Sequence, residues 1–164
     1  MNFISIIMGS KSDYEIMKNC SDTFEKFNVK YEMIISSAHR SPARTKEYIK
    51  EAEAKGAVAF IAAAGMAAHL AGALAAGTTK PVIGVPMKGG AMDGMDAMLS
   101  TVQMPSGMPV ATVALGKAGA INAAYLAIQI LAITDKELAV KLKEDRKIKE
   151  KAVESDSKTI EVIL

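Results

Sequence analysis

Short hydrophobic runs alternate with segments of helical periodicity along most of the chain. The first run, residues 3–8, is apolar at nearly every position, which is typical of a strand buried on both faces of a parallel sheet. Similar runs predict strands at residues 29–35, 57–62, 81–85 and 109–113. Helices are expected at residues 12–27, 41–55, 67–76, 92–102 and 118–133. This alternation predicts an α/β fold with a five-stranded parallel sheet and helices on both faces.

Three helix starts carry recognisable capping sequences. Residues 12–15 (SDYE) match a capping box, with Ser12 as the expected N-cap. Ser41 is expected to cap the next helix, with Pro42 in its first position. Residues 134–137 (TDKE) form a second capping box, which predicts an additional charged helix at about residues 134–152. Its apolar side is expected to contain Leu138, Leu142 and Ile148.

Length, charge and cysteine content narrow the class of protein. The 164 residues suit one domain, 1–164, and the net charge of +2 does not favour a nucleic-acid or membrane surface. The single cysteine, Cys20, excludes an intrachain disulfide, which fits a reducing compartment, and we interpret it as a packing residue. No secretory signal or long uninterrupted apolar run is recognised, so a cytoplasmic protein is expected.

The residues that could take part in binding or catalysis follow the predicted strands. In parallel sheets, ligands bind outside the carboxyl ends of the strands. The segments that follow the first four strands are rich in glycine, serine and histidine, and both histidines of the chain lie in them. They are residues 9–13 (GSKSD), 36–40 (SSAHR), 64–69 (AGMAAH) and 86–90 (PMKGG). The sequence therefore predicts one binding site at this edge of the sheet.

Two of these segments suit a phosphorylated ligand. Gly9 allows close approach of the backbone to a ligand, and the free N–H groups at a helix start favour an anion. The side chains expected to donate to a phosphate are Ser10, Ser12, Ser37 and Arg40. Asp13 has the wrong charge for that role and is better placed on ribose hydroxyls. The alternative remains that Ser12 and Asp13 only cap a helix.

His39 is the candidate for proton transfer, because it stands between a strand end and a helix start, directly before Arg40. His69 is expected one turn into an alanine-rich helix, where a structural core histidine is the simpler interpretation. The spacing of His and Cys does not match a metal site. Neither the glycine pattern of dinucleotide-binding folds nor the Walker loop follows the first strand.

Several motifs, taken together and in order, resemble the PurE family over roughly residues 3–142. They are MGSKSD (8–13), SAHRSP (37–42), AGMAAHL (64–70), GVP (84–86), VQMPSG (102–107), PVATV (109–113) and GKAGAINAA (116–124). The resemblance implies a flavodoxin-like three-layer α/β/α sandwich that assembles as an octamer. It also implies an enzyme of purine biosynthesis that uses no metal, organic cofactor or ATP.

The resemblance also implies roles for individual residues. It makes His39 the general acid and base, and it makes the loop 65–70 the holder of a carboxylate or of carbon dioxide. The substrate contacts that it implies are Gly9, Ser10, Ser12, Asp13, Ser37, Ala38, Arg40, Gly65, Met66, Ala67, His69 and Leu70. The reaction implied is conversion of N5-carboxyaminoimidazole ribonucleotide to 4-carboxy-5-aminoimidazole ribonucleotide. An ATP-dependent synthetase would supply the substrate.

Three functions are weighed. Arg40 and His69 match the mutase class of the family, whereas direct carboxylases, which use carbon dioxide, tend to carry Lys after the catalytic His and lack the second His. A flavin- or nucleotide-binding module without catalysis is the third; of the few aromatic residues, only Tyr14 lies close to a strand-end loop.

The chain departs from the family pattern AGGAAHLPG at Met66 and Ala71. By the same resemblance, the terminal helix packs on a neighbouring subunit.

Overall fold

A computed structural model describes residues 2–160 of the chain, which divides into two compact units, Met1–Ala127 and Ile128–Leu164. The first unit contains a five-stranded sheet in which every pairing is parallel. Its strands are β1 (Phe3–Met8), β2 (Tyr31–Ile35), β3 (Ala57–Gly65), β4 (Val82–Met87) and β5 (Ala111–Thr112). The spatial order β2-β1-β3-β4-β5 is that of flavodoxin-like folds, so the predicted fold class is confirmed.

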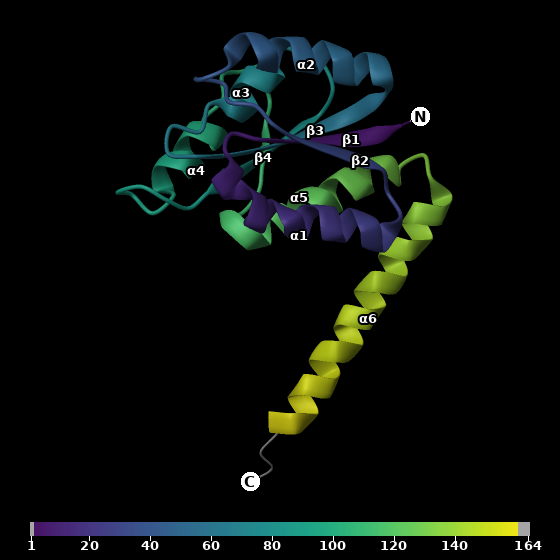
Figure 1. The fold of residues 1–164 in the computed structure, drawn as a ribbon. Coiled ribbons are helices and arrows are strands. Elements are labelled where there is room, and N and C mark those ends of the chain that lie inside the picture. Colours follow the sequence, from purple (N-terminus) through teal and green to yellow (C-terminus); the bar gives the residue numbers. More distant parts are fainter. Residues whose placement is uncertain (1, 161–164) are drawn as a thin grey trace. The chain divides into compact units, whose positions relative to one another are not determined.

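Helices cover both faces of the sheet, as Figure 1 shows: α2 and α3 lie on one face and α1 on the other, together with α5. The helices are α1 (Tyr14–Phe27), α2 (Pro42–Lys55), α3 (Leu70–Ala75), α4 (Met95–Val102) and α5 (Gly116–Leu131). A short 3₁₀ helix, η1 (Lys11–Asp13), precedes α1. The three layers follow from right-handed crossovers between parallel strands.

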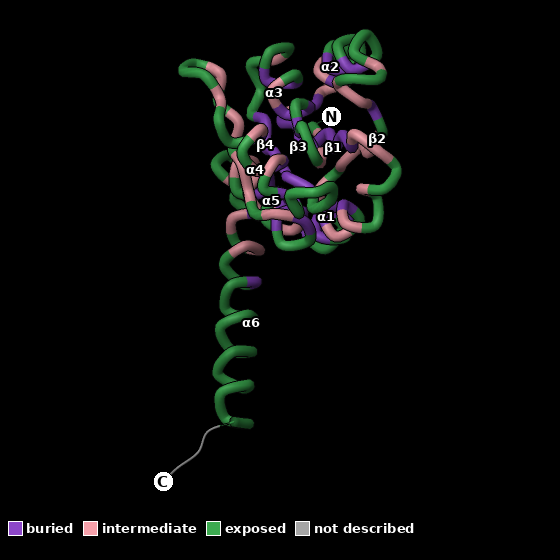
Figure 2. Tube along the Cα trace, turned by 90° about the vertical axis from the view of Figure 1, so that its left-hand side faces the viewer, coloured by how far each residue is buried: buried purple, intermediate pink, exposed green. Residues whose placement is uncertain are grey.

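The core consists of the sheet and the inner sides of these helices, which are buried in Figure 2. Side chains of the central strands, such as Ile6 and Phe60, are fully buried. On the inner side of α5, three fully buried positions are occupied by alanine: Ala120, Ala123 and Ala124. Small side chains allow close packing between backbones. Cys20 is also fully buried, and burial raises the pKa of its thiol, which confirms its role in packing.

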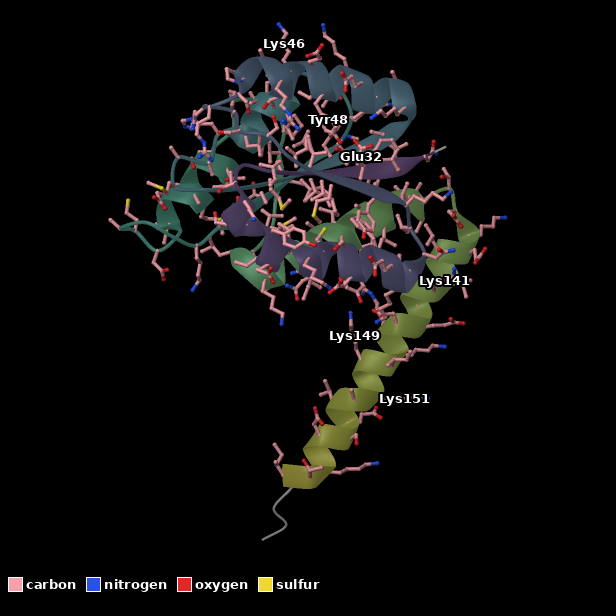
Figure 3. The ribbon with its side chains drawn as sticks, viewed as in Figure 1. Glu32, Lys46, Tyr48, Lys141, Lys149 and Lys151 are labelled. Atoms are coloured by element: carbon pink, nitrogen blue, oxygen red, sulfur yellow. The ribbon has the colours of Figure 1, made fainter. Side chains whose placement is uncertain are left out.

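A polar network lies between β1, β2 and α2. Tyr48 of α2 donates a hydrogen bond to Glu32 of β2 at 2.8 Å, and the two side chains meet in Figure 3. The hydroxyl oxygens of Tyr48 and buried Ser5 are also 2.8 Å apart. Burial raises the pKa of Tyr48, and Glu32 raises it further. Satisfied polar groups of this kind fix how a helix lies on a sheet.

The second unit contains the end of α5 and helix α6 (Lys136–Ile160), which is longer than the predicted 134–152. Leu138 is buried, but Ile148 is 65% exposed, so the expected apolar side is only partly covered. Ion pairs one turn apart join Lys141 to Glu137 at 2.8 Å and Lys149 to Asp145 at 2.9 Å. Within residues 2–160, no helix is both long enough and apolar enough to cross a bilayer.

The structure corrects two of the three predicted helix caps and confirms the position of the third. Ser10, rather than Ser12, caps the η1 turn, and α1 begins only at Tyr14. Ser41 is the N-cap residue of α2 and Pro42 begins the helix, as predicted, but the Ser41 hydroxyl bonds the backbone of Ser37 instead of an N–H group of the helix. At α6, Asp135 accepts hydrogen bonds from two N–H groups of the first turn, so Thr134 is not the cap.

Several elements are shorter than predicted, among them α3 and β5. Helix α3 begins at Leu70 rather than residue 67, because Gly65 still belongs to β3 and Met66 takes a left-handed backbone with φ of 55°. Strand β5 lies at the edge of the sheet and pairs with β4 over only two residues. Neither difference moves the loops at the carboxyl ends of the strands.

Candidate functional site

A cavity of about 550 Å³ lies at the carboxyl ends of β1 to β4. The strand order reverses between β1 and β3, which is where ligands bind in sheets of this kind. The cavity brings together every site residue predicted from the sequence. Its lining is Gly9, Ser10, Ser12, Asp13, Ser37, Ala38, His39, Arg40, Ala64, Gly65, Met66, Ala67, His69, Leu70, Met87, Lys88, Gly89 and Gly90.

The loop after β1 presents hydroxyl groups and one carboxyl group. Ser10 Oγ accepts a hydrogen bond from Ser12 Oγ at 3.0 Å. The Gly9 N–H donates to Ala63 O at 2.9 Å, which fixes this loop to β3. Partial burial raises the pKa of Asp13, opposed by hydrogen bonds from Ser10 and Ser12 and by the charge of Arg40. This part of the cavity therefore offers both donors and an acceptor.

The loop after β2 is tied to the loop after β1 by Arg40. Its guanidinium donates to Gly9 O at 3.0 Å, and its own N–H donates to Ser37 Oγ at 3.1 Å. Behind it, buried Ser36 and Thr45 hold hydroxyl oxygens 2.8 Å apart, which anchors the loop to α2. The remaining N–H groups of Arg40 can point to an anion in the cavity.

The two histidines meet in this cavity, although they are thirty residues apart in the sequence. His39 Nε2 and His69 Nδ1 lie 2.7 Å apart, and the rings are nearly perpendicular at 85°. Both side chains are exposed, so the expectation that His69 is a core histidine is wrong. It precedes the first turn of α3 instead of lying within it. One proton between these nitrogens orients both rings.

The loop after β3 is strained and is held by α4. Met66 has φ of 55°, a conformation that favours glycine, and its side chain is 61% exposed. The Ala68 N–H donates to Ser100 Oγ at 2.9 Å, and that hydroxyl donates to Asp96 O at 2.7 Å. Ser100 was missed in the sequence, because it lies on a helix more than thirty residues away.

The loop after β4 adds Lys88, which lies in the expected segment 86–90 but had no predicted role. Lys88, Gly89 and Gly90 line the cavity beside the Met66 loop. A Cβ placed on Gly90 would lie 3.3 Å from Met66 Cγ, so these two loops touch. Lys88 could have been found from its position directly after a strand. Across residues 2–160, no group of three His, Cys, Asp or Glu side chains could hold a metal ion.

Comparisons with known proteins identify the family of the chain. The family model described as AIR carboxylase matches residues 3–152. The N5-carboxyaminoimidazole ribonucleotide mutase of Bacillus subtilis is 51% identical, over 96% of this chain and 98% of its own. The mutase of the same name from Escherichia coli K12 is 49% identical, over 88% and 85%. A crystal structure of Treponema denticola PurE superposes with a TM-score of 0.89 at 27% identity, over 99% and 100%. The chain therefore belongs to the AIR carboxylase family.

Proposed function

We propose that this protein is an N5-carboxyaminoimidazole ribonucleotide mutase of purine biosynthesis. It converts the N5-carboxylated nucleotide to 4-carboxy-5-aminoimidazole ribonucleotide. The observation that carries the proposal is the His39–His69 pair in a cavity that also holds hydroxyl, guanidinium and loop N–H groups. Relatives about half identical over most of the chain are named as this mutase.

The nucleotide lies across the strand ends in this proposal. Its phosphate takes hydrogen bonds from Ser10, Ser37 and Arg40, which the loops after β1 and β2 bring together. Asp13 accepts from the ribose hydroxyls. The aminoimidazole then lies toward β3, beside the histidine pair, and the carboxylate lies on the loop 65–70. Other backbone N–H groups of that loop donate to the carboxylate oxygens, while the Ala68 N–H donates to Ser100 and so holds the loop in place.

His39 moves one proton in two steps. As the N5–carboxylate bond breaks, its electron pair stays on nitrogen, which takes a proton from protonated His39. The carbon dioxide remains on the loop 65–70, and C4 of the ring attacks it. Neutral His39 then removes the C4 proton, which restores both the aromatic ring and the protonated histidine. Holding carbon dioxide beside C4 is catalysis by proximity, and His69 orients His39 throughout.

The other functions fit less well. Direct carboxylases of this family tend to lack a second histidine, whereas His69 here contacts His39. A flavin-binding module needs aromatic rings to stack on the ligand, but no Phe, Tyr or Trp lines the cavity. The proposal uses no metal, organic cofactor or ATP.

A paired assay without ATP tests the proposal. One arm supplies the N5-carboxylated nucleotide in low bicarbonate, and the other supplies the uncarboxylated nucleotide with added bicarbonate. We expect efficient formation of the 4-carboxy product in the first arm only. Efficient conversion in the second arm alone would identify a direct carboxylase, and none in either arm would refute both assignments.

Assembly and cellular context belong to the same proposal. We infer one PurE-type domain, because the family match runs through both compact units. We infer a cytoplasmic homo-octamer supplied by an ATP-dependent synthetase, with α6 of each chain packed on a neighbour. Exposed apolar side chains on α6, including Val140, Ile148 and Val153, support that packing. The mass measured by light scattering, for the intact chain and for one ending at Ile133, tests it: a single-chain mass for the intact protein, or an unchanged mass after truncation, would contradict the arrangement.

A further inference from the structure

The cavity contains one arginine and one lysine side chain, and the proposed function uses only the arginine. Arg40 and Lys88 are the cations among its lining residues, and Asp13 is the only acidic one. Arg40 is fixed to Gly9 at the end of β1 by a hydrogen bond of 3.0 Å. The nucleotide carries two anionic groups, a phosphate and a carboxylate, at opposite ends. Lys88 is therefore the cation available for the second anion.

Lys88 lies at the end of the cavity where that carboxylate is expected. Gly65 at the end of β3 pairs with Met87 at the end of β4, so Lys88 begins beside Met66. Strand β3 separates β4 from β1, and neighbouring strands lie about 4.8 Å apart. The β4 loop is thus about two strand spacings from the β1 loop that Arg40 contacts. The two cations are separated along the direction in which the nucleotide lies.

In the free protein, Lys88 has a weak partner on its own loop. Lys88 Nζ lies 3.8 Å from Asp93 Oδ2, with the two side chains 61% and 82% exposed. The loop folds back so that a Cβ on Gly94 would lie 3.2 Å from Lys88 Cα, and the positive φ of 94° at Gly94 suits glycine. Such exposed ion pairs contribute little to stability, so another carboxylate can replace Asp93.

We propose that Lys88 selects the carboxylated nucleotide by exchanging Asp93 for the carboxylate of the ligand. Asp93 also limits how tightly Lys88 holds that carboxylate. A cation fixed on the carboxylate would oppose decarboxylation, because the negative charge leaves the carbon dioxide when the bond breaks. Because Asp93 lies on the same loop, the Lys88 ammonium can return to the Asp93 carboxylate as carbon dioxide forms. The inference rests on the proposed function, because it assumes that the cavity binds these nucleotides.

Equilibrium binding of two ligands tests the inference. Calorimetry measures the Kd of the 4-carboxy nucleotide and of the uncarboxylated nucleotide, in a His39→Asn background where turnover is blocked. The ratio of the two Kd values reports the preference for the carboxylate. We expect Lys88→Met to reduce that preference about fivefold, as an exposed charge pair allows, and added salt to reduce it in the parent protein. Asp93→Asn is expected to increase it.

Lys46→Met is the matched control, because it removes the same charge from exposed Lys46 on α2, which does not line the cavity (Figure 3). It should leave the ratio unchanged. An unchanged ratio in Lys88→Met, or an equal loss of affinity for both ligands, would overturn the role of Lys88. If the parent protein bound neither nucleotide, the proposed function itself would fail, so the two failures are distinguishable.

Discussion

Replacing His39 with asparagine is expected to lower kcat by about 10²- to 10⁴-fold or more, because proton transfer by a positioned side chain contributes that much. Asparagine cannot carry a proton between N5 and C4, and its shorter side chain also gives up the 2.7 Å contact that His39 Nε2 makes with His69 Nδ1. Steady-state rates with the N5-carboxylated nucleotide measure the loss.

Nucleotide binding is the control for this variant. The phosphate and ribose contacts are made by the loops after β1 and β2, so the Kd of the 4-carboxy product should stay within a few-fold of the original. Turnover within a few-fold of the unsubstituted protein would remove His39 from the mechanism. A large loss of binding together with turnover would instead assign His39 to the substrate site rather than to proton transfer.

The second large effect is expected at Arg40. Arg40→Ala should raise KM about 10- to 100-fold with a smaller change in kcat, because a hydrogen bond to a charged group contributes about 1.5–3 kcal/mol. The backbone N–H that Arg40 donates to Ser37 remains in the variant, so the loop keeps this bond. Only the guanidinium, which joins Gly9 and would reach the phosphate, is lost.

Arg44→Ala provides the matched comparison, because Arg44 is an exposed arginine in the first turn of α2, four residues after Arg40 and outside the cavity. Its KM should be unchanged. An unchanged KM in Arg40→Ala would move the phosphate to another part of the cavity. An equal increase in both variants would mean that net charge, rather than a contact at Arg40, governs nucleotide binding.

The strands and the loops that follow them could be predicted, because the hydrophobic pattern gives the strand positions and ligands bind at the carboxyl ends of parallel strands. Apolar runs located every strand, and parallel pairing then required their carboxyl ends to share one edge. That rule alone predicts that the segments containing Gly9, Ser37 and Gly65 lie close together. The structure adds the cavity that they line and their hydrogen-bond partners. The histidine pair needed the structure, since no local pattern indicates that residues 39 and 69 touch.

Other parts of the site depend on contacts that no local pattern contains. Ser12 looked like a helix cap, but the chain makes a 3₁₀ turn first, so Ser10 takes that role. Ser100 acts through Ala68 from another helix. The family pattern has glycine where this chain has Met66. The backbone φ of 55° at this position explains why glycine suits the position. The side chain of Met66 then packs against Gly90 in the neighbouring loop.

In the proposed mechanism, the carbon dioxide released from N5 stays in the cavity until C4 captures it. The most direct test supplies the N5-carboxylated nucleotide with ¹³C in its carboxylate, in excess unlabelled bicarbonate with carbonic anhydrase to exchange any free carbon dioxide. Mass spectrometry of the 4-carboxy product then measures how much label is retained. Trapping on the loop 65–70 predicts that most of the product keeps the ¹³C. Label diluted to the level of the bicarbonate pool would show that carbon dioxide leaves the protein, and would contradict the mutase mechanism.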